Sequence, residues 1–133
     1  MVGLVIASHG KLSDCILDTA KLFIKNNKNI SAVNLEESSG SDEFSKKLEK
    51  AINEVDSGNG VLILLDLYGG TPSNISWNTI SSKSSCRGVT GINMGMILEI
   101  LIQRDDSKTL EELTEIAKKA GKDGIKILRP VLF

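Results

Sequence analysis

The chain contains one histidine, His9, which directly follows an apolar run at residues 2–8 and precedes Gly10. A single imidazole does not make a metal site, so chemistry at His9 requires partners from elsewhere in the chain. Asp66 ends another apolar run, residues 61–66, and its carboxylate is a suitable partner. If this carboxylate accepts a hydrogen bond from Nδ1–H, the Nε2 lone pair stays free and His9 becomes a nucleophile.

The segment that follows this run, LYGGTPSN, has the residue types that bind a phosphoryl group. Gly69 and Gly70 allow close approach of the backbone. We expect a helix to begin here, with Thr71 as its cap and Pro72 in its first turn. The free N–H groups and the positive dipole end of this helix point to the region beside the two glycines. Thr71 adds a hydroxyl donor, and Gly10 leaves room beside the histidine. The sequence therefore predicts a nucleophile next to an anion-binding segment.

Each of these residues also has a plainer interpretation. A lone histidine is more often a surface or core residue than a nucleophile, an aspartate at a strand end is often a turn former, and Gly-Gly before Thr-Pro is a common turn. We favour the functional interpretation because all three features meet at one edge of the predicted sheet. The usual P-loop, dinucleotide-binding and nucleophile-elbow motifs do not occur in the sequence. We expect no metal site and no cofactor.

Buried strands alternate with amphipathic helices along the chain, which predicts an α/β fold with a doubly wound parallel sheet and helices on both faces. The expected strands are residues 2–8, 30–35, 61–66 and 87–92, with a last strand at 125–128. Ligands of such sheets bind beyond the carboxyl ends of the strands, where the winding reverses. With the strands in 2-1-3-4 order, His9 and Asp66 end neighbouring strands about 4.8 Å apart, and their side chains can meet.

The apolar segment at residues 94–102 has two interpretations. It is either a helix sandwiched in the core or a helix shared with another subunit, and we favour the subunit contact. The two cysteines, Cys15 and Cys86, have no CxxC spacing. We expect both to be buried thiols in a reducing compartment.

Length and charge limit the remaining classes of function. The 133 residues predict a single domain, residues 1–133. Sixteen basic and 17 acidic residues give a net charge of -1 with no basic block, which argues against nucleic-acid binding. No apolar stretch is long enough to span a bilayer, and no signal peptide is apparent. We therefore expect a cytoplasmic protein that does not insert into membranes.

Three blocks, GLVIASHG, GVLILLDLYGGTPSN and VTGINMGMILEILIQRDD, resemble in order and spacing the IIA domain (EIIA) of the mannose/fructose/sorbose family of the sugar phosphotransferase system (PTS). The resemblance covers nearly the whole chain. It implies that His9 accepts phosphate on Nε2 from the phosphocarrier HPr and donates it to EIIB, which serves the membrane EIIC and EIID subunits. It also implies that Asp66 orients the ring and that Thr71 is the small hydroxyl residue beside the phosphate.

On this basis the expected site has two further parts. Gly10, Gly69 and Gly70 join Thr71 around the phosphate, and Tyr68, Ser73 and Asn74 form a rim on which partners dock. The family fold is a parallel sheet in 2-1-3-4 order with a C-terminal strand that, in dimeric members, crosses to the other subunit and runs antiparallel there. Residues 125–128 fit that strand, and the exchange would bring residues 94–102 against the second subunit.

The chain departs from the family pattern at two positions. Ser73 replaces a bulky aromatic residue, which would alter partner docking, and Gly95 replaces a proline, which would loosen a helix start. Because the sequence ends at Phe133, we expect EIIB to be a separate protein. Two alternatives remain: the phosphotransfer subunit of a PTS-dependent dihydroxyacetone kinase, against which the GGTPSN block argues, and a regulatory module that His9 phosphorylation switches.

Overall fold

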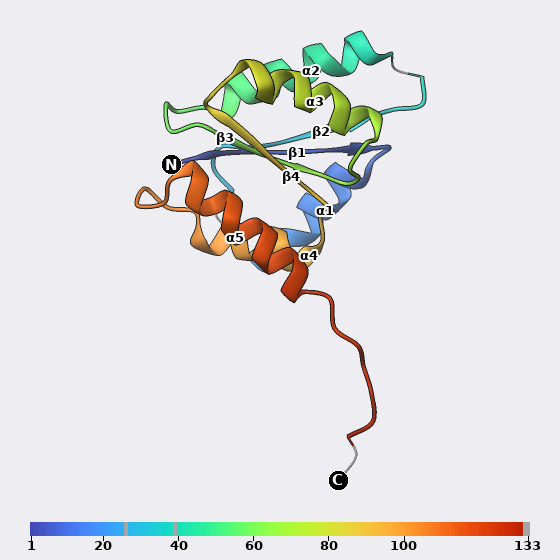
Figure 1. The fold of residues 1–133 in the computed structure, drawn as a ribbon, viewed down its shortest axis with the longest axis vertical. Coiled ribbons are helices and arrows are strands. Elements are labelled where there is room, and N and C mark those ends of the chain that lie inside the picture. Colours follow the sequence, from blue (N-terminus) through green and yellow to red (C-terminus); the bar gives the residue numbers. More distant parts are fainter. Residues whose placement is uncertain (26, 39, 132–133) are drawn as a thin grey trace.

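The computed structural model describes residues 1–25, 27–38 and 40–131. Its centre is a four-stranded parallel sheet in the order β2-β1-β3-β4 (Figure 1). The strands are β1 (Gly3–His9), β2 (Ile30–Leu35), β3 (Val61–Leu65) and β4 (Cys86–Thr90). The α/β fold and the predicted strand order are confirmed.

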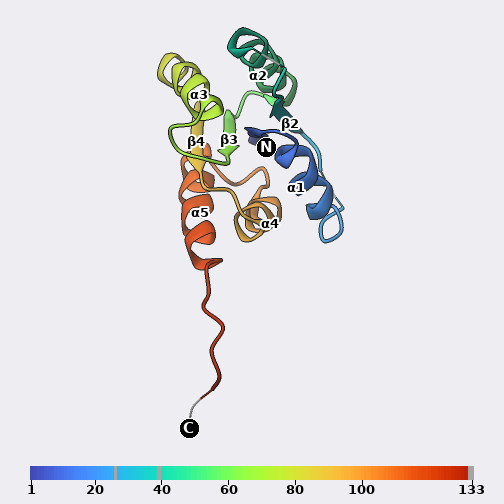
Figure 2. The ribbon, with the colours of Figure 1, turned by 90° about the vertical axis from the view of Figure 1, so that its right-hand side faces the viewer.

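Helices cover both faces of this sheet, with α2 and α3 on one side and α1, α4 and α5 on the other (Figure 2). Their bounds are α1 Leu12–Ala20, α2 Ser41–Val55, α3 Thr71–Ser82, α4 Met94–Gln103 and α5 Leu110–Asp123. The two central strands are buried on both faces because successive side chains alternate between two cores. Leu62 and Leu64 enter the core under α4 and α5, whereas Ile63 and Leu65 enter the core under α2.

Strands β1 and β3 are direct neighbours and end at the same edge of the sheet. Their register pairs Ala7 with Leu65, so His9 and Asp66 both lie just beyond the last paired residues. On the other side of β1, His9 itself pairs with Leu35 of β2. The segments that follow β1, β2 and β3 therefore meet at one edge.

Helix α4 packs mainly into the core of its own chain. Met96, Ile97 and Ile100 are buried, and Ile102 is 67% exposed. The core-sandwich interpretation of residues 94–102 thus accounts for most of its apolar side chains. The Asn93 side chain accepts a hydrogen bond from the Met96 N–H at 2.9 Å and caps the helix, so Gly95 lies within a regular first turn.

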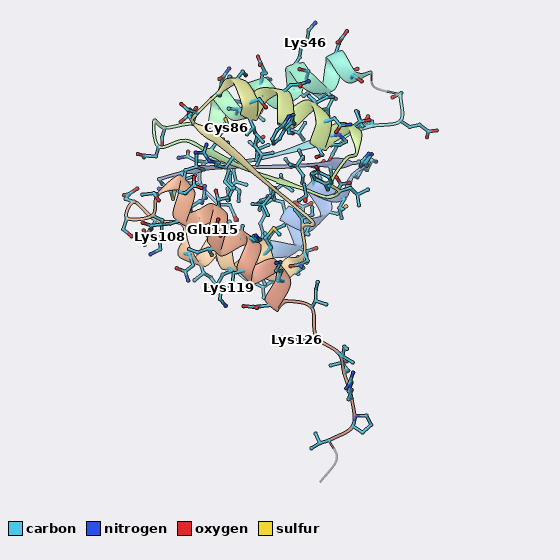
Figure 3. The ribbon with its side chains drawn as sticks, in the orientation of Figure 1. Lys46, Cys86, Lys108, Glu115, Lys119 and Lys126 are labelled. Atoms are coloured by element: carbon cyan, nitrogen blue, oxygen red, sulfur yellow. The ribbon has the colours of Figure 1, made fainter. Side chains whose placement is uncertain are left out.

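The two cysteines have different environments. Cys86 is fully buried at the start of β4 (Figure 3), as expected. Cys15 is exposed, so the expectation of burial is wrong for this residue. Helix α1 turns Ser13, Leu17 and Ala20 towards the sheet, and Cys15 consequently faces solvent.

After α5 the chain leaves the body of the molecule as an extended segment, residues 125–131 (Figure 1). Its apolar side chains Ile125, Ile127 and Leu128 are exposed, and Lys126 also projects away from the body (Figure 3). This segment pairs with no strand of its own described chain, so the exchanged strand stays a prediction. Within the described part of the chain, each helix is too short or too polar to cross a bilayer.

Candidate active site

The side chains of His9 and Asp66 are in direct contact at the edge where β1 and β3 end. The distance from His9 Nδ1 to Asp66 Oδ2 is 2.8 Å. The same carboxylate oxygen accepts the backbone N–H of His9 at 3.0 Å, and Oδ1 accepts the backbone N–H of Leu67 at 2.9 Å. The Asp66 side chain is 10% exposed, whereas that of His9 is 43% exposed. The acid is therefore held in place beneath a ring that solvent and other proteins can reach.

The hydrogen bonds of Asp66 determine which nitrogen of His9 carries a proton. An ionised carboxylate only accepts hydrogen bonds, so Nδ1 must be the donor in this contact. In the neutral ring, Nε2 then keeps its lone pair. A ring of this kind can attack an electrophile such as a phosphoryl group.

The turn after Asp66 brings Gly70 against the ring of His9. A Cβ built on Gly70 would lie 2.6 Å from Cε1 and 3.2 Å from Nε2 of the ring. Gly69 and Gly10 have positive φ angles, 83° and 57°, which other residues adopt at a cost. The glycines on both sides of the histidine are thus explained by turn geometry and by close approach of the ring.

Helix α3 begins at Thr71, and Gly70 occupies the N-cap position. The expectation that Thr71 caps the helix is wrong, because the extended backbone of Gly70 makes Thr71 the first helical residue and no side chain caps this end. The Thr71 side chain is exposed, beside the N-terminus of α3. Thr71 lines the same hollow as His9, and the first N–H groups of the helix, which have no partner within the helix, lie at this end of α3.

Of the three expected rim residues, Tyr68 lies on the turn between β3 and α3, and Ser73 and Asn74 lie in the first turn of α3. Tyr68 is 90% exposed, Asn74 is exposed, and Ser73 is half-buried. The Asn74 side chain donates a hydrogen bond to the Gly69 carbonyl at 3.3 Å. Asn74 therefore also supports the glycine turn, in addition to any contact with a partner.

A hollow of about 460 Å³ opens beside His9 and Thr71. Another wall comes from the segment after β2 and from the first residue of α2, and it includes Glu36, Glu37, Gly40 and Ser41. This wall was not predicted from the sequence. The signal was available in the strand order, because β2 neighbours β1 and its carboxyl end reaches the same edge.

The chain is similar to known proteins over nearly its whole length. The family model EIIA-man, described as "PTS system fructose IIA component", matches residues 3–118. The "PTS system mannose-specific EIIAB component" of Escherichia coli K12 is 27% identical over 128 residues, which are 96% of this chain and 40% of that protein. The chain thus spans about two fifths of that relative.

Two further proteins agree with this match. The "PTS system fructose-specific EIIA component" of Bacillus subtilis is 25% identical over 105 residues, 79% of this chain and 72% of that protein. The structure titled "Mannose/sorbose specific IIA subunit of phosphotransferase system from Enterococcus faecalis" has a TM-score of 0.87 at 24% identity, with 99% and 98% of the two chains covered. That likeness supports the fold.

Proposed function

The chain belongs to the EIIA-man family of sugar phosphotransferase system components, and from this premise we propose that His9 is the residue that carries the phosphoryl group. In this proposal Nε2 accepts phosphate from phosphorylated HPr and donates it to an EIIB protein. The membrane subunits EIIC and EIID then use it during sugar uptake, so the protein acts in the cytoplasm. The observation that supports the assignment most strongly is the 2.8 Å contact between His9 Nδ1 and Asp66.

The proposed step exchanges one phosphorus–nitrogen bond for another. The Nε2 lone pair of His9 attacks the phosphorus of a donor phosphohistidine whose ring is positively charged. The bond from phosphorus to the donor ring breaks, and that ring leaves as a neutral imidazole. The His9 ring becomes an imidazolium that keeps its Nδ1 proton, and the Asp66 carboxylate stabilises the new charge. The step consumes no proton and no cofactor.

The phosphoryl oxygens need donors that do not rearrange during the transfer. We assign this role to the backbone around Gly10, Gly69 and Gly70, and to the Thr71 hydroxyl with the N-terminus of α3. The support is their position around the ring and the dipole of α3, whose positive end is not capped by a side chain. Tyr68, Ser73 and Asn74 form the surface on which HPr and EIIB dock.

A homodimer with exchanged C-terminal strands is also part of the proposal. Strand β4 is an edge strand of the sheet, with one row of N–H and C=O groups available for another strand. A groove of about 420 Å³ runs beside it and includes Val89, Met96 and Lys118. The extended segment at residues 125–131 of a second copy supplies apolar side chains that suit this groove.

The test is phosphorylation in vitro with phosphoenolpyruvate, enzyme I and HPr. We expect one phosphoryl group per chain, labile in acid and stable in base, and no label on His9→Gln. Label that remains on His9→Gln would assign the nucleophile to another residue. Discharge then separates the alternatives: loss of the label to EIIB supports the carrier, loss only to a dihydroxyacetone kinase subunit supports that alternative, and retention supports a regulatory module.

A further inference from the structure

Two helices of this protein begin after a glycine with almost the same backbone conformation. Gly40 precedes α2 with φ -82° and ψ 168°, and Gly70 precedes α3 with φ -78° and ψ 170°. Any residue adopts these angles, and glycine is accepted at an N-cap but is less favoured there than Ser, Asp and Asn. Backbone geometry therefore does not explain glycine at either position.

The surroundings of the two glycines differ. Gly40 lines the same hollow as His9, but a Cβ on Gly40 would meet nothing within 4 Å. A Cβ on Gly70 would meet Cε1, Nε2 and Nδ1 of His9 at 2.6, 3.2 and 3.8 Å. The first of these distances is below van der Waals contact, so a side chain at position 70 and the present position of the ring exclude each other.

The ring has little freedom to yield in place, because the Asp66 carboxylate holds its Nδ1 at 2.8 Å. A Cβ at position 70 would push on the Cε1–Nε2 edge of the ring. This edge lies opposite Cγ, the atom through which the ring is attached to the backbone of β1. The imidazole is the mobile end of a side chain, whereas Gly70 is followed by a regular helix. The ring is therefore the part that moves, and the movement weakens its bond to Asp66.

We propose that Gly70 is a positioning residue for His9. Because Gly70 has no side chain, the imidazole ring can lie against its backbone, and in this position Nδ1 contacts Asp66 and Nε2 points outward. This role rests on the proposed function of His9 and goes beyond the phosphate contact assigned to the Gly70 backbone. It also adds, for position 70 alone, a reason against the larger hydroxyl and carboxylate caps, because each of them carries a Cβ.

The test compares Gly70→Ala with Gly40→Ala. Both substitutions place alanine at an N-cap with almost the same backbone angles, so we expect similar effects on the two helix ends, and only the first introduces a Cβ against the ring. The first readout is proton–nitrogen NMR of the unphosphorylated protein with labelled histidine. Because the chain has one histidine, the spectrum reports directly which nitrogen of His9 carries the proton.

We expect wild type and Gly40→Ala to show the Nδ1–H form, and Gly70→Ala to show a mixture in which the Nε2–H form is prominent. The second readout is the rate of phosphorylation by HPr, which we expect to fall on the order of 10²-fold in Gly70→Ala, since misplacement of a reacting group by about an ångström has this effect. Similar thermal denaturation of the two variants would show that the helix end is not the cause.

An unchanged Nδ1–H spectrum and a wild-type rate in Gly70→Ala would overturn the proposal. If Gly70→Ala fails to fold, Gly70→Ser, whose hydroxyl restores a cap, makes the same test. The outcome is separable from the proposed function: failure of wild type to accept phosphate from HPr would overturn that function, whereas the NMR comparison needs no phosphoryl transfer.

Discussion

The Asp66 carboxylate is the acceptor in every hydrogen bond that it forms at this site. Oδ2 receives N–H groups from the backbone and the ring of His9, and Oδ1 receives the N–H of Leu67. The amide of an asparagine has an NH₂ group in place of one of these oxygens. It therefore cannot accept hydrogen bonds from both His9 and Leu67. The orientation of His9 therefore depends on the charge and the acceptor capacity of this side chain, in addition to its shape.

Asp66→Asn tests this dependence with a side chain of nearly the same size. Whichever way the amide turns, its NH₂ group meets an N–H donor, either that of Leu67 or those of His9. We expect the phosphorylation rate to fall on the order of 10²-fold or more, by analogy with the loss of the correct tautomer in a Ser-His-Asp triad. Phosphate transfer kinetics and the NMR spectrum of His9 measure the two effects. A normal rate with a normal spectrum would contradict the role of Asp66.

The two cysteines provide a test of burial at the residue scale. Burial raises the pKa of the Cys86 thiol, which reduces the thiolate fraction at neutral pH, whereas Cys15 is exposed. We expect an alkylating reagent to label Cys15 alone in the native protein and both cysteines in denaturant, as counted by mass spectrometry. Cys15→Ser is the control and should take no label when native. Labelling of Cys86 at the rate of Cys15 would show that the start of β4 opens readily.

At the scale of elements, Arg104 connects the end of α4 to the starts of two strands. It is 7% exposed, and its guanidinium donates hydrogen bonds to the carbonyls of Val2, Lys28 and Asn29. Burial lowers the pKa of Arg104 to about 10, so it is still charged at neutral pH. The residues just before β1 and β2 thus share one buried cation.

Arg104→Met should lower the free energy of unfolding by about 2–4 kcal/mol, because the buried Val2 carbonyl and the partly buried carbonyls of Lys28 and Asn29 lose the hydrogen bonds of the guanidinium. Urea denaturation measures the loss. Because the pKa is lowered in the folded state, discharge begins only near pH 10, and the difference between variant and wild type should be constant between about pH 6 and 9.

Arg87→Met is the control for Arg104, because Arg87 also donates to two backbone carbonyls, those of Ser84 and Cys86, but its side chain is 40% exposed. Arg87 also forms an ion pair with Glu111 at the surface, at 2.9 Å. An exposed pair of this kind contributes about 0–1 kcal/mol. Equal losses in the two variants would contradict the connecting role of Arg104.

The sequence was sufficient for elements whose pattern is local. The runs around β1 and β3 are apolar throughout, and only a sheet covered on both faces buries such runs, so the parallel sheet could be predicted. The order of the strands was implied by the family resemblance, and the meeting of His9 with Asp66 depended on that order. Helix ends and faces were harder. Thr71 and Gly70 are both acceptable N-caps, and the turn after β3 selects between them. The exposure of Cys15 depends on which face of α1 meets the sheet, and the wall with Glu36 and Glu37 requires the register of β2.

At the scale of the whole molecule, the flank beyond β4 is the part of the described chain that a second copy would change most. Ile80 of α3 packs over Gly88 of β4. Trp77, the only tryptophan, lies one turn earlier on the same side of the helix and is 68% exposed. We expect an exchanged strand along β4 to lie near this side chain, so Trp77 would report on the proposed dimer.

A chain that ends at Gly124 lacks the extended segment and should be a monomer, whereas the full chain should be a dimer in sedimentation analysis. We expect the fluorescence of Trp77 to shift to longer wavelength in the shortened chain, since the indole becomes more hydrated. The phosphorylation of His9 should persist, because the shortened chain keeps β1, β3 and α3. Equal masses and equal spectra for the two chains would contradict the exchanged dimer.

The most direct test of the central claim is the position of phosphate on the ring. Proton–nitrogen and phosphorus NMR of the phosphorylated protein distinguish the two nitrogens. We predict phosphorus on Nε2 of His9 and a retained proton on Nδ1, with the hydrogen bond to Asp66 intact. Phosphorus on Nδ1, or on any residue other than His9, would contradict the account.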